Sequence, residues 1–294
     1  MKTVNAREIA RSLKVFADER APIGVTLGLS FGLCAGSWAM SGADGPALLR
    51  VVAIVFLVLL VLRIIDDVRS LDHDRIASPE RSLPAGRISV RPLVAGAAVL
   101  FAAALLLSVP RLSLALGLLA LYYAGYYVLA ERIPVVMRPA LVNAVFLAIP
   151  AAVGLMGGDV GRHGLALLGL FFWLSAVGHD FAHAVHAAGE SPAGVQTCSH
   201  VVGPRLTAVI GLACYVGGCA AGVLAVRGVP ALEGGDWPRL FLVGLAALFA
   251  RVAYLLARLI ARPSRARARP LYVSGFATFV VPSLLLGLDR LLAR

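Results

Sequence analysis

Long apolar stretches, separated by short polar segments, dominate the hydrophobic pattern of this chain. Each stretch holds roughly 20 residues, the length that an α-helix needs to cross a hydrocarbon core of about 30 Å. The pattern therefore predicts one all-α integral membrane domain over residues 1–294. Nine membrane-spanning helices are expected, at residues 22–40, 48–65, 92–109, 112–130, 139–156, 164–185, 205–226, 238–260 and 271–289.

Composition agrees with this class and excludes a soluble protein. Of the 294 residues, 60% are hydrophobic and only 15% are charged, far too apolar a balance for a soluble domain of this size. The apolar stretch at 22–40 follows about twenty mostly polar residues and lacks a small-residue cleavage pattern, so we do not interpret it as a signal peptide. Glycines at every fourth position of this stretch indicate close packing against a neighbouring helix: Gly24, Gly28, Gly32 and Gly36.

The net charge of +11 is explained by membrane topology and not by nucleic acid. Basic side chains gather before the first span, in segment 63–91 and in segment 258–269, whereas the alternate loops are poor in Lys and Arg. This positive-inside pattern predicts a cytoplasmic N-terminus and an external C-terminus in a multi-pass protein, which we expect in a bacterial cytoplasmic membrane. Membrane lipid is an expected partner; no nucleic acid and no obligate protein partner are inferred.

An acidic segment follows the second span and is the most unusual polar feature of the chain. Asp66, Asp67, Asp72 and Asp74 come directly after the apolar stretch and are followed by arginines and a Pro-Ala-Gly turn. Ionisable side chains at the end of a membrane helix are costly unless they bind a cation or a partner, so they indicate a functional site. The alternative is a solvated acidic loop.

Residues 66–86 resemble the first signature of the UbiA superfamily of intramembrane prenyltransferases. That signature reads Asn-Asp-x-x-Asp-x-x-x-Asp and is followed by an Arg-Pro-x-x-x-Gly turn. Asp67 and Asp74 match family aspartates, whereas Asp66 stands where Asn is usual and Ser70 replaces the middle aspartate. The resemblance implies nine helices around a central cavity, with Mg²⁺ as the cofactor.

A second polar cluster lies at the end of the sixth span, where the family carries its second aspartate motif. Gly194-Val-Gln-Thr197 resembles the family's Gly-Ile-x-Thr ending, which places Glu190 on the last family acid and His186 and His183 on the other two. Asp180 precedes them by about one helical turn. The spacing of Asp180, His183 and His186 allows them to share one helical face.

Three interpretations of this second cluster remain open. In the first, it is a diverged second motif in which Asp180 and Glu190 bind magnesium while the histidines bond phosphate or act as bases. In the second, it is a site for zinc or iron, including a di-iron desaturase-like centre, although six histidines in the chain are few for that purpose. In the third, it is polar packing without a catalytic part.

The family also carries a basic residue, thought to hold the diphosphate, before an Asn or Gln on the next helix. Arg132 and Arg138 match that region and Asn143 matches the amide. Guanidinium groups suit bidentate phosphate binding, although either arginine is equally consistent with the positive-inside pattern. Tyrosines at the end of the fourth span are usually an interfacial belt, but they could instead bond a phosphate. The predicted diphosphate-binding residues are Arg81, Tyr126, Arg132, Arg138 and Asn143.

Two acidic clusters thus close two spans whose ends fall on the cytoplasmic side, and together they could hold magnesium for a polyphosphate substrate. The resemblance implies magnesium-dependent transfer of a prenyl group from a prenyl diphosphate to a small acceptor, expected to be aromatic, with release of pyrophosphate. Segments 66–91 and 186–204 are the expected catalytic loops. The implied metal ligands are Asp66, Asp67, Asp74, Asp180 and Glu190, and the implied catalytic residues are Asp67, Asp74, Asp180, His183, His186 and Glu190.

Two alternatives to prenyl transfer are kept. A terpene cyclase of the same family would ionise the same substrate and let a double bond of the prenyl chain attack the cation. A non-catalytic protein that binds or transports lipid phosphates would release no pyrophosphate. No residue selects the acceptor among the aromatic acids, quinone precursors, tetrapyrroles, sugar phosphates and glycerolipids that the family uses.

Overall fold

The computed structural model describes residues 5–157, 162–187, 196–227 and 238–292. All regular secondary structure in these ranges is helical, which confirms the predicted all-α class. The helices are α1 (Ala6–Arg20), α2 (Ile23–Ser41), α3 (Gly45–Arg69), α4 (Leu71–Ala77), α5 (Val90–Leu107), α6 (Pro110–Leu129), α7 (Arg138–Val142), α8 (Val145–Gly157), α9 (Arg162–Ala187), α10 (Cys198–Val202), α11 (Pro204–Arg227), α12 (Arg239–Ala261) and α13 (Arg265–Leu292), with a 3₁₀ turn at Val135–Met137.

Nine segments of the described chain are long and apolar enough to cross a membrane, as the sequence predicts. The fifth of them, Val135–Gly157, is not one continuous helix, because α7 ends at Val142 and α8 begins at Val145. The second extends to Arg69, beyond the predicted end at residue 65, so its last turns carry polar side chains.

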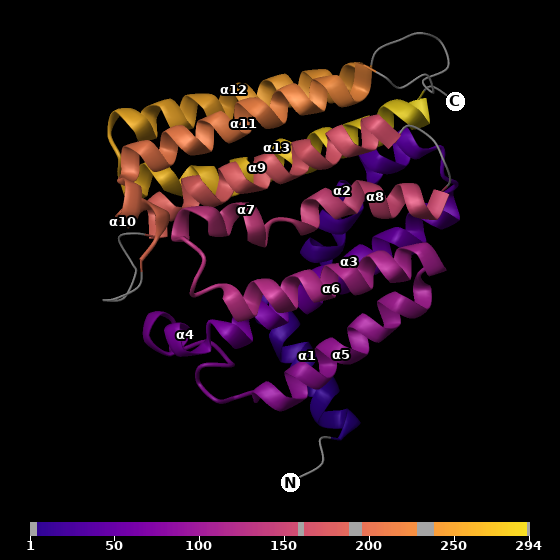
Figure 1. Cartoon of the computed structure of the whole chain (residues 1–294), viewed down its shortest axis with the longest axis vertical. Coiled ribbons are helices and arrows are strands. Elements are labelled where there is room, and N and C mark those ends of the chain that lie inside the picture. The colour runs from indigo at the N-terminus through magenta and orange to yellow at the C-terminus, as the bar shows by residue number, and fades with distance from the viewer. Residues whose placement is uncertain (1–4, 158–161, 188–195, 228–237, 293–294) are drawn as a thin grey trace. The chain divides into compact units, whose positions relative to one another are not determined.

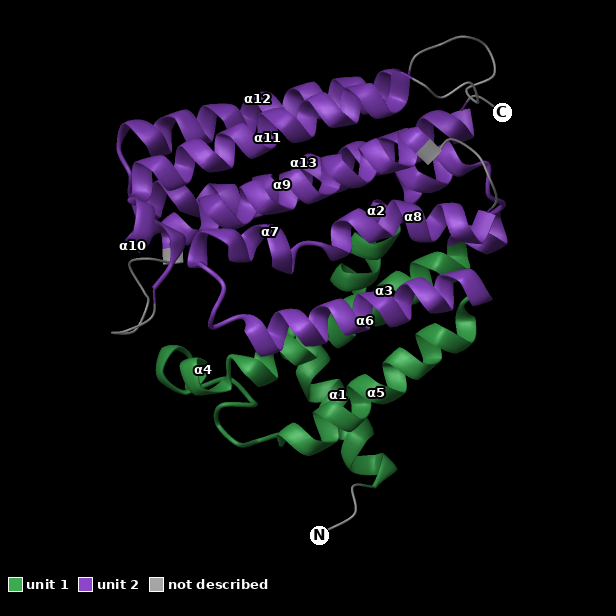
Figure 2. Ribbon diagram, viewed as in Figure 1, with its two compact units in different colours: residues 1–31, 49–109 green, residues 32–48, 110–294 purple. Residues whose placement is uncertain are grey.

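The chain divides into two compact units, which are coloured separately in Figure 2. Unit 1 contains residues 1–31 and 49–109, and unit 2 contains residues 32–48 and 110–294. The first acidic segment belongs to unit 1, and the histidine-rich end of α9 belongs to unit 2.

Unit 1 is built on the packing of α1 against the helices that flank the acidic segment. A capping box starts α1, since the Asn5 side chain accepts from the Glu8 backbone N–H and the Glu8 carboxylate accepts from that of Asn5. Phe16 is buried in a cluster with Ile64 of α3 and Leu93 of α5. This apolar contact sets the end of α1 beside the end of α3.

Unit 2 contains four long helices, α9, α11, α12 and α13, that run side by side in Figure 1. Buried apolar side chains from all four fill the space between them, among them Val185, Tyr215, Leu256 and Leu271. Burial of one such side chain contributes about 1.5–3 kcal/mol relative to exposure in water, although inside a membrane the gain comes from packing. The packing holds the end of α9 against the beginning of α13.

The glycine spacing in α2 has the predicted packing role over its second half. The backbone N–H of Gly36 donates to Ser283 Oγ at 3.0 Å, and a Cβ on Gly36 would lie 2.6 Å from the same atom. Gly32 similarly faces Val280 of α13. Nothing lies within 4 Å of a Cβ built on Gly24 or Gly28, so the close approach is confined to the C-terminal half.

Candidate active site

The first acidic group sits where α3 gives way to α4 in unit 1. Asp66 and Asp67 lie in the last turns of α3, and Asp74 lies on α4. Asp67 is only 5% exposed and Asp74 only 7% exposed, whereas the side chain of Asp72 is almost fully exposed. Buried carboxylates require charged partners, so the contacts of Asp67 and Asp74 define the site.

Two arginines hold the carboxylate of Asp67. Arg20, the last residue of α1, donates from Nε to Oδ2 at 2.6 Å and from Nη2 to Oδ1 at 3.0 Å, a bidentate pair. Arg63, one helical turn before Asp67, lies 3.3 Å from Oδ1 and also 3.6 Å from Asp66 Oδ2. The Nε atom of Arg63 is buried, and no described group accepts a hydrogen bond from it.

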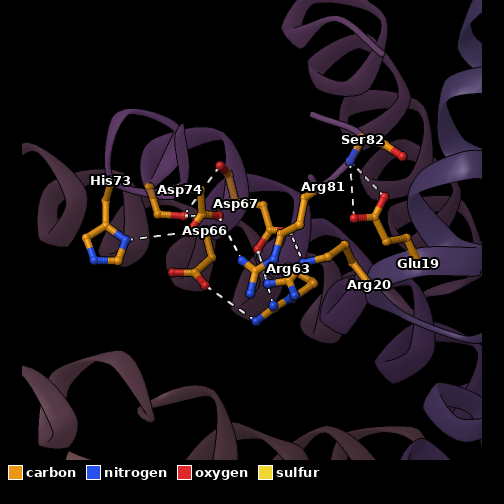
Figure 3. A network of polar contacts seen from close by, with 10 residues as sticks. Glu19, Arg20, Arg63, Asp66, Asp67, His73, Asp74, Arg81 and Ser82 are labelled. Atoms are coloured by element: carbon orange, nitrogen blue, oxygen red, sulfur yellow. Dashed lines mark hydrogen bonds and ion pairs between the residues drawn. The ribbon is translucent and has the colours of Figure 1, made fainter. Parts of the chain in front are cut away.

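Asp74 is held in the same network, which Figure 3 shows from close by. Arg81 donates from Nη1 to Asp74 Oδ2 at 3.1 Å, and Ser70 Oγ lies 3.4 Å from the same oxygen. His73 Nδ1 lies 3.5 Å from the other oxygen. Ser70, which replaces a family aspartate, therefore contributes a hydroxyl to the acidic group where the family has a charge.

The turn that carries Arg81 is anchored to α1. The carboxylate of Glu19 accepts from the backbone N–H of Ser82 at 2.9 and 3.1 Å. Gly86 closes the turn with a φ of +73°, a left-handed conformation that favours glycine, which explains the glycine of the signature. The position of Arg81 beside Asp74 thus depends on both α1 and the turn.

The acidic segment differs from the predicted loop. Residues 66–69 continue α3, residues 71–77 form α4, and α5 already begins at Val90, so only residues 78–89 are irregular. Helix α3 continues because Arg63 pairs with acids three and four residues further on, an arrangement that stabilises a helical turn. Asp66, Asp67 and Asp74 are thereby presented by helices, and Ser70 lies in the turn between α3 and α4.

The sequence did not identify three residues of this network, which are Glu19, Arg20 and Arg63. The helical spacing of Arg63 from Asp66 and Asp67 was a signal that could have revealed one of them. Arg20 lies 47 residues before Asp67, and no local pattern connects the two.

The second polar cluster does not form a single face in unit 2. Asp180 accepts a hydrogen bond at 2.7 Å from Nδ2 of Asn143, which follows α7 and also donates to the Pro139 carbonyl. The structure therefore joins two predicted site residues, Asp180 and Asn143, that lie on different helical segments. Glu190, predicted as the last family acid, lies outside the described residues.

The histidines of α9 point to a different neighbour. The rings of His179 and His183 are stacked with centroids 6.3 Å apart, and His186 follows at 5.8 Å from His183. Tyr272 of α13 lies 5.6 Å from His183, ring to ring. The face predicted to be shared is therefore divided, because residues three apart on a helix differ in direction by about 60° and here meet different helices.

The remaining predicted diphosphate-binding residues lie around the end of α6. Arg138 donates from Nε to the carbonyl of Ile133, which closes the connection before α7. Arg132 is exposed, and Tyr126 packs its ring 5.2 Å from that of Tyr127. The hydroxyl of Tyr123 donates to the Val142 carbonyl at 2.6 Å, so this buried tyrosine fixes the break between α7 and α8.

Comparison with known proteins identifies the family. The sequence pattern of the UbiA prenyltransferase family matches residues 28–280 of this chain. The chain belongs to the UbiA prenyltransferase family. It is therefore a prenyltransferase and an integral, multi-pass membrane protein, in agreement with the predicted class.

Two curated relatives carry a more specific name. Digeranylgeranylglyceryl phosphate synthase of Methanoculleus marisnigri is 30% identical over 214 residues, which are 71% of this chain and 73% of that protein. The synthase of the same name from Methanoregula boonei is 31% identical over 206 residues, 68% of this chain and 70% of the relative.

Solved structures of UbiA proteins share the fold. A structure reported for digeranylgeranylglyceryl phosphate synthase in membranes has a TM-score of 0.64 at 20% identity and covers 95% of this chain and 98% of its own. A UbiA homologue from Aeropyrum pernix K1, solved without ligand, has a TM-score of 0.65 at 17% identity and covers 92% and 97%. At these identities the likeness concerns the fold alone.

Proposed function

We propose that this UbiA-family protein transfers a prenyl group from a prenyl diphosphate to an acceptor that carries a glyceryl phosphate, with Mg²⁺ as cofactor and pyrophosphate as the second product. The observation that carries the proposal is the pair of buried, arginine-bound carboxylates Asp67 and Asp74, with the exposed Asp66 beside them, in the register of the first family signature. The relatives' name favours the glyceryl phosphate, whereas the aromatic acceptor expected from the resemblance stays a prediction.

The donor atoms of the first acidic group fit magnesium. Mg²⁺ prefers oxygen ligands and is commonly bound by one or two carboxylates, water and substrate phosphates instead of a complete protein cage. Within the part of the chain that the structure describes, no three His, Cys, Asp or Glu side chains gather closely enough to hold a metal ion by themselves. Two buried carboxylates, Asp67 and Asp74, match the magnesium mode.

Magnesium at these carboxylates would exchange with guanidinium groups already present. Asp67 gives both of its oxygens to arginines, and Asp74 gives one to Arg81. When bound, the ion would neutralise the diphosphate and favour departure of pyrophosphate. The displaced guanidinium groups of Arg20 and Arg81 remain beside the site and suit hydrogen bonding to phosphate oxygens. Asp180 and Glu190 as further ligands stay a prediction.

The reaction breaks the allylic carbon–oxygen bond of the donor, and pyrophosphate leaves with the bonding electrons. The acceptor hydroxyl oxygen then forms the new bond to carbon and loses its proton. Arg20, Arg63 and Arg81 supply positive charge where negative charge develops on the leaving group. Their rigid pairing with helix-borne aspartates holds this charge in place before the substrate arrives.

The proposed reaction is tested with the purified protein in lipid nanodiscs. Geranylgeranyl diphosphate and Mg²⁺ are supplied with geranylgeranylglyceryl phosphate, with 4-hydroxybenzoate, or with no acceptor, and products are identified by mass spectrometry. We expect digeranylgeranylglyceryl phosphate and stoichiometric pyrophosphate in the first reaction. If prenylated benzoate is the only product, the acceptor is aromatic and the glyceryl phosphate assignment is wrong. A cyclic hydrocarbon formed without acceptor would indicate a cyclase.

The same assay tests the non-catalytic alternative, and cysteine labelling in vesicles tests the orientation of the chain. Binding of the diphosphate without release of pyrophosphate under all three conditions would contradict enzymatic transfer. We propose a cytoplasmic N-terminus from the distribution of Lys and Arg. Labelling of a cysteine introduced at Arg7 by an impermeant reagent in sealed, right-side-out vesicles is expected to require permeabilisation.

A further inference from the structure

A groove with a basic lining lies between the end of α9 and the beginning of α13, inside unit 2. One cavity of about 650 Å³ is lined by His183, His186 and Arg269, with Tyr272 and Val273 on its wall. An adjoining cavity of about 600 Å³ shares His186 and Arg269 with the first. The two cavities adjoin at these shared residues, and we name them together the α9–α13 groove.

Apart from Tyr272, the charged and titratable side chains that are described around this groove are all basic. Arg265 also lines the second cavity, so two guanidinium groups and two imidazoles face the groove, and no carboxylate is among its described lining residues. The first turns of α13 add the partial positive charge of a helix N-terminus. An anion can therefore bind here directly, without a metal ion to bridge it.

Arg269 differs from its neighbour Arg267 in its bonding. Arg267 donates from Nη1 to the carbonyls of Arg258 and Arg262, which satisfies the end of α12. Nothing in the described chain accepts a hydrogen bond from the guanidinium of Arg269, which is exposed beside the cavity. His186 uses Nδ1 toward the carbonyl of Arg265 at 3.4 Å, which leaves its Nε2 for a ligand.

The other wall of the groove is apolar. Tyr272 is 54% exposed and Val273 is 73% exposed, although both lie on a helix that is long and apolar enough to span a membrane. A ligand that suits both walls has an anionic head and a hydrocarbon tail. The ring of His183 is stacked on that of His179 and tilted against that of Tyr272, so it contacts the apolar wall.

We propose that the α9–α13 groove binds the phosphate monoester of the acceptor lipid, with Arg269, His183 and His186 as its ligands. The proposal rests on the glyceryl phosphate acceptor proposed above and assigns the acceptor's phosphate to residues apart from the acidic network. Two family acids are replaced by histidine at this position. That exchange removes negative charge from the groove and supplies N–H donors to an anion.

Binding of dodecyl phosphate to the detergent-purified protein in EDTA tests the groove directly. Arg269→Gln should weaken the affinity about tenfold or more, because a charge-assisted hydrogen bond is lost. His186→Gln keeps a donor and should weaken it less than His186→Ala does. Arg262→Gln removes an exposed arginine of the same connection whose side chain does not line the groove, so it should leave the affinity within twofold.

Comparison ligands identify the source of the phosphate. Dodecanol, which lacks the phosphate, should bind at least tenfold more weakly than dodecyl phosphate to the wild type and should be insensitive to Arg269→Gln. The affinity for phosphatidylglycerol should likewise not change in Arg269→Gln. Loss of phosphatidylglycerol binding in Arg269→Gln, equal to the loss of dodecyl phosphate binding, would make the groove a membrane-lipid site and overturn the acceptor assignment.

The groove and the proposed reaction can fail separately. If Arg269→Gln leaves dodecyl phosphate affinity within twofold, the groove proposal is wrong even when transfer is observed. If the Arg269 dependence is found but no glyceryl phosphate is prenylated, the anion site stands while its assignment to the acceptor fails. In the transfer assay, Arg269→Gln should raise the KM for geranylgeranylglyceryl phosphate about tenfold and leave that for geranylgeranyl diphosphate unchanged.

Discussion

The acidic network of unit 1 and the α9–α13 groove of unit 2 offer opposite solutions to the binding of an anion. In the first, buried carboxylates are already neutralised by arginines, and a diphosphate suits them only together with a divalent cation. In the second, arginine and histidine side chains line a cavity without a described carboxylate. If both proposals hold, one chain distinguishes a metal-bound diphosphate from a free phosphate monoester by charge alone.

Removal of divalent metal should separate the two regions most strongly. We expect EDTA to lower the affinity for geranylgeranyl diphosphate more than about 100-fold, since without the cation nothing links the diphosphate to the arginine-paired carboxylates. The affinity for dodecyl phosphate should change less than twofold. Isothermal titration with each ligand, in EDTA and in excess Mg²⁺, measures both; equal metal dependence of the two ligands would contradict the distinction.

Loss of Arg20 should destabilise the acidic network alone. Arg20→Gln removes a bidentate partner of buried Asp67, and with Arg63 still present we expect a cost of about 2 kcal/mol. Thermal unfolding in detergent should show a melting temperature several degrees lower, and Mg²⁺ should restore more of it than in the wild type. Arg7→Gln, at an exposed position of α1, is the matched control. Equal melting temperatures of the two variants would show that Arg20 does not stabilise the structure.

A carboxylate placed in the α9–α13 groove should make its phosphate binding depend on Mg²⁺. His183→Asp introduces an acid where the sequence predicts a position of the family's second motif, and we expect it to weaken dodecyl phosphate binding in EDTA about tenfold through like-charge repulsion. Addition of Mg²⁺ should recover part of the affinity. An affinity that neither falls in EDTA nor responds to Mg²⁺ would show that His183 does not face the bound phosphate.

The smallest expected effect concerns the turn that carries Arg81. Gly86 has a φ of +73°, so Gly86→Ala should cost about 1 kcal/mol and lower the rate of prenyl transfer by a few fold without changing dodecyl phosphate binding. Gly24→Ala, at a helical glycine with nothing within 4 Å of its Cβ, should leave the transfer rate unchanged. Equal transfer rates for Gly86→Ala and the wild type would show that the conformation of this turn does not affect catalysis.

The fold class, the nine spans and the first acidic group could be predicted from the sequence because these features depend on local patterns. Apolar length predicts a span, and the spacing of Asp67 and Asp74 matches a contiguous signature. The partners of these acids were not predictable in the same way. The pairing of Arg20 with Asp67 is a contact between α1 and α3 that depends on how Phe16 packs.

The second cluster shows where sequence periodicity fails. The three-residue spacing of Asp180, His183 and His186 predicted one shared face. In the structure, however, Asp180 and His183 contact different neighbouring segments. Asn143 approaches Asp180 from the break after α7, and Tyr272 approaches His183 from α13. Helical spacing gives directions around one helix and carries no information about which neighbour lies in each direction.

The central claim is that Asp67 binds the donor diphosphate through magnesium and thereby drives prenyl transfer. It is tested most directly by titrating Mg²⁺ and measuring pyrophosphate release from geranylgeranyl diphosphate for the wild type, Asp67→Asn and Asp72→Asn, the last at an exposed acid of the same segment. We expect saturable, Mg²⁺-dependent release in the wild type and Asp72→Asn and at least a hundredfold loss in Asp67→Asn. Undiminished release in Asp67→Asn would contradict it.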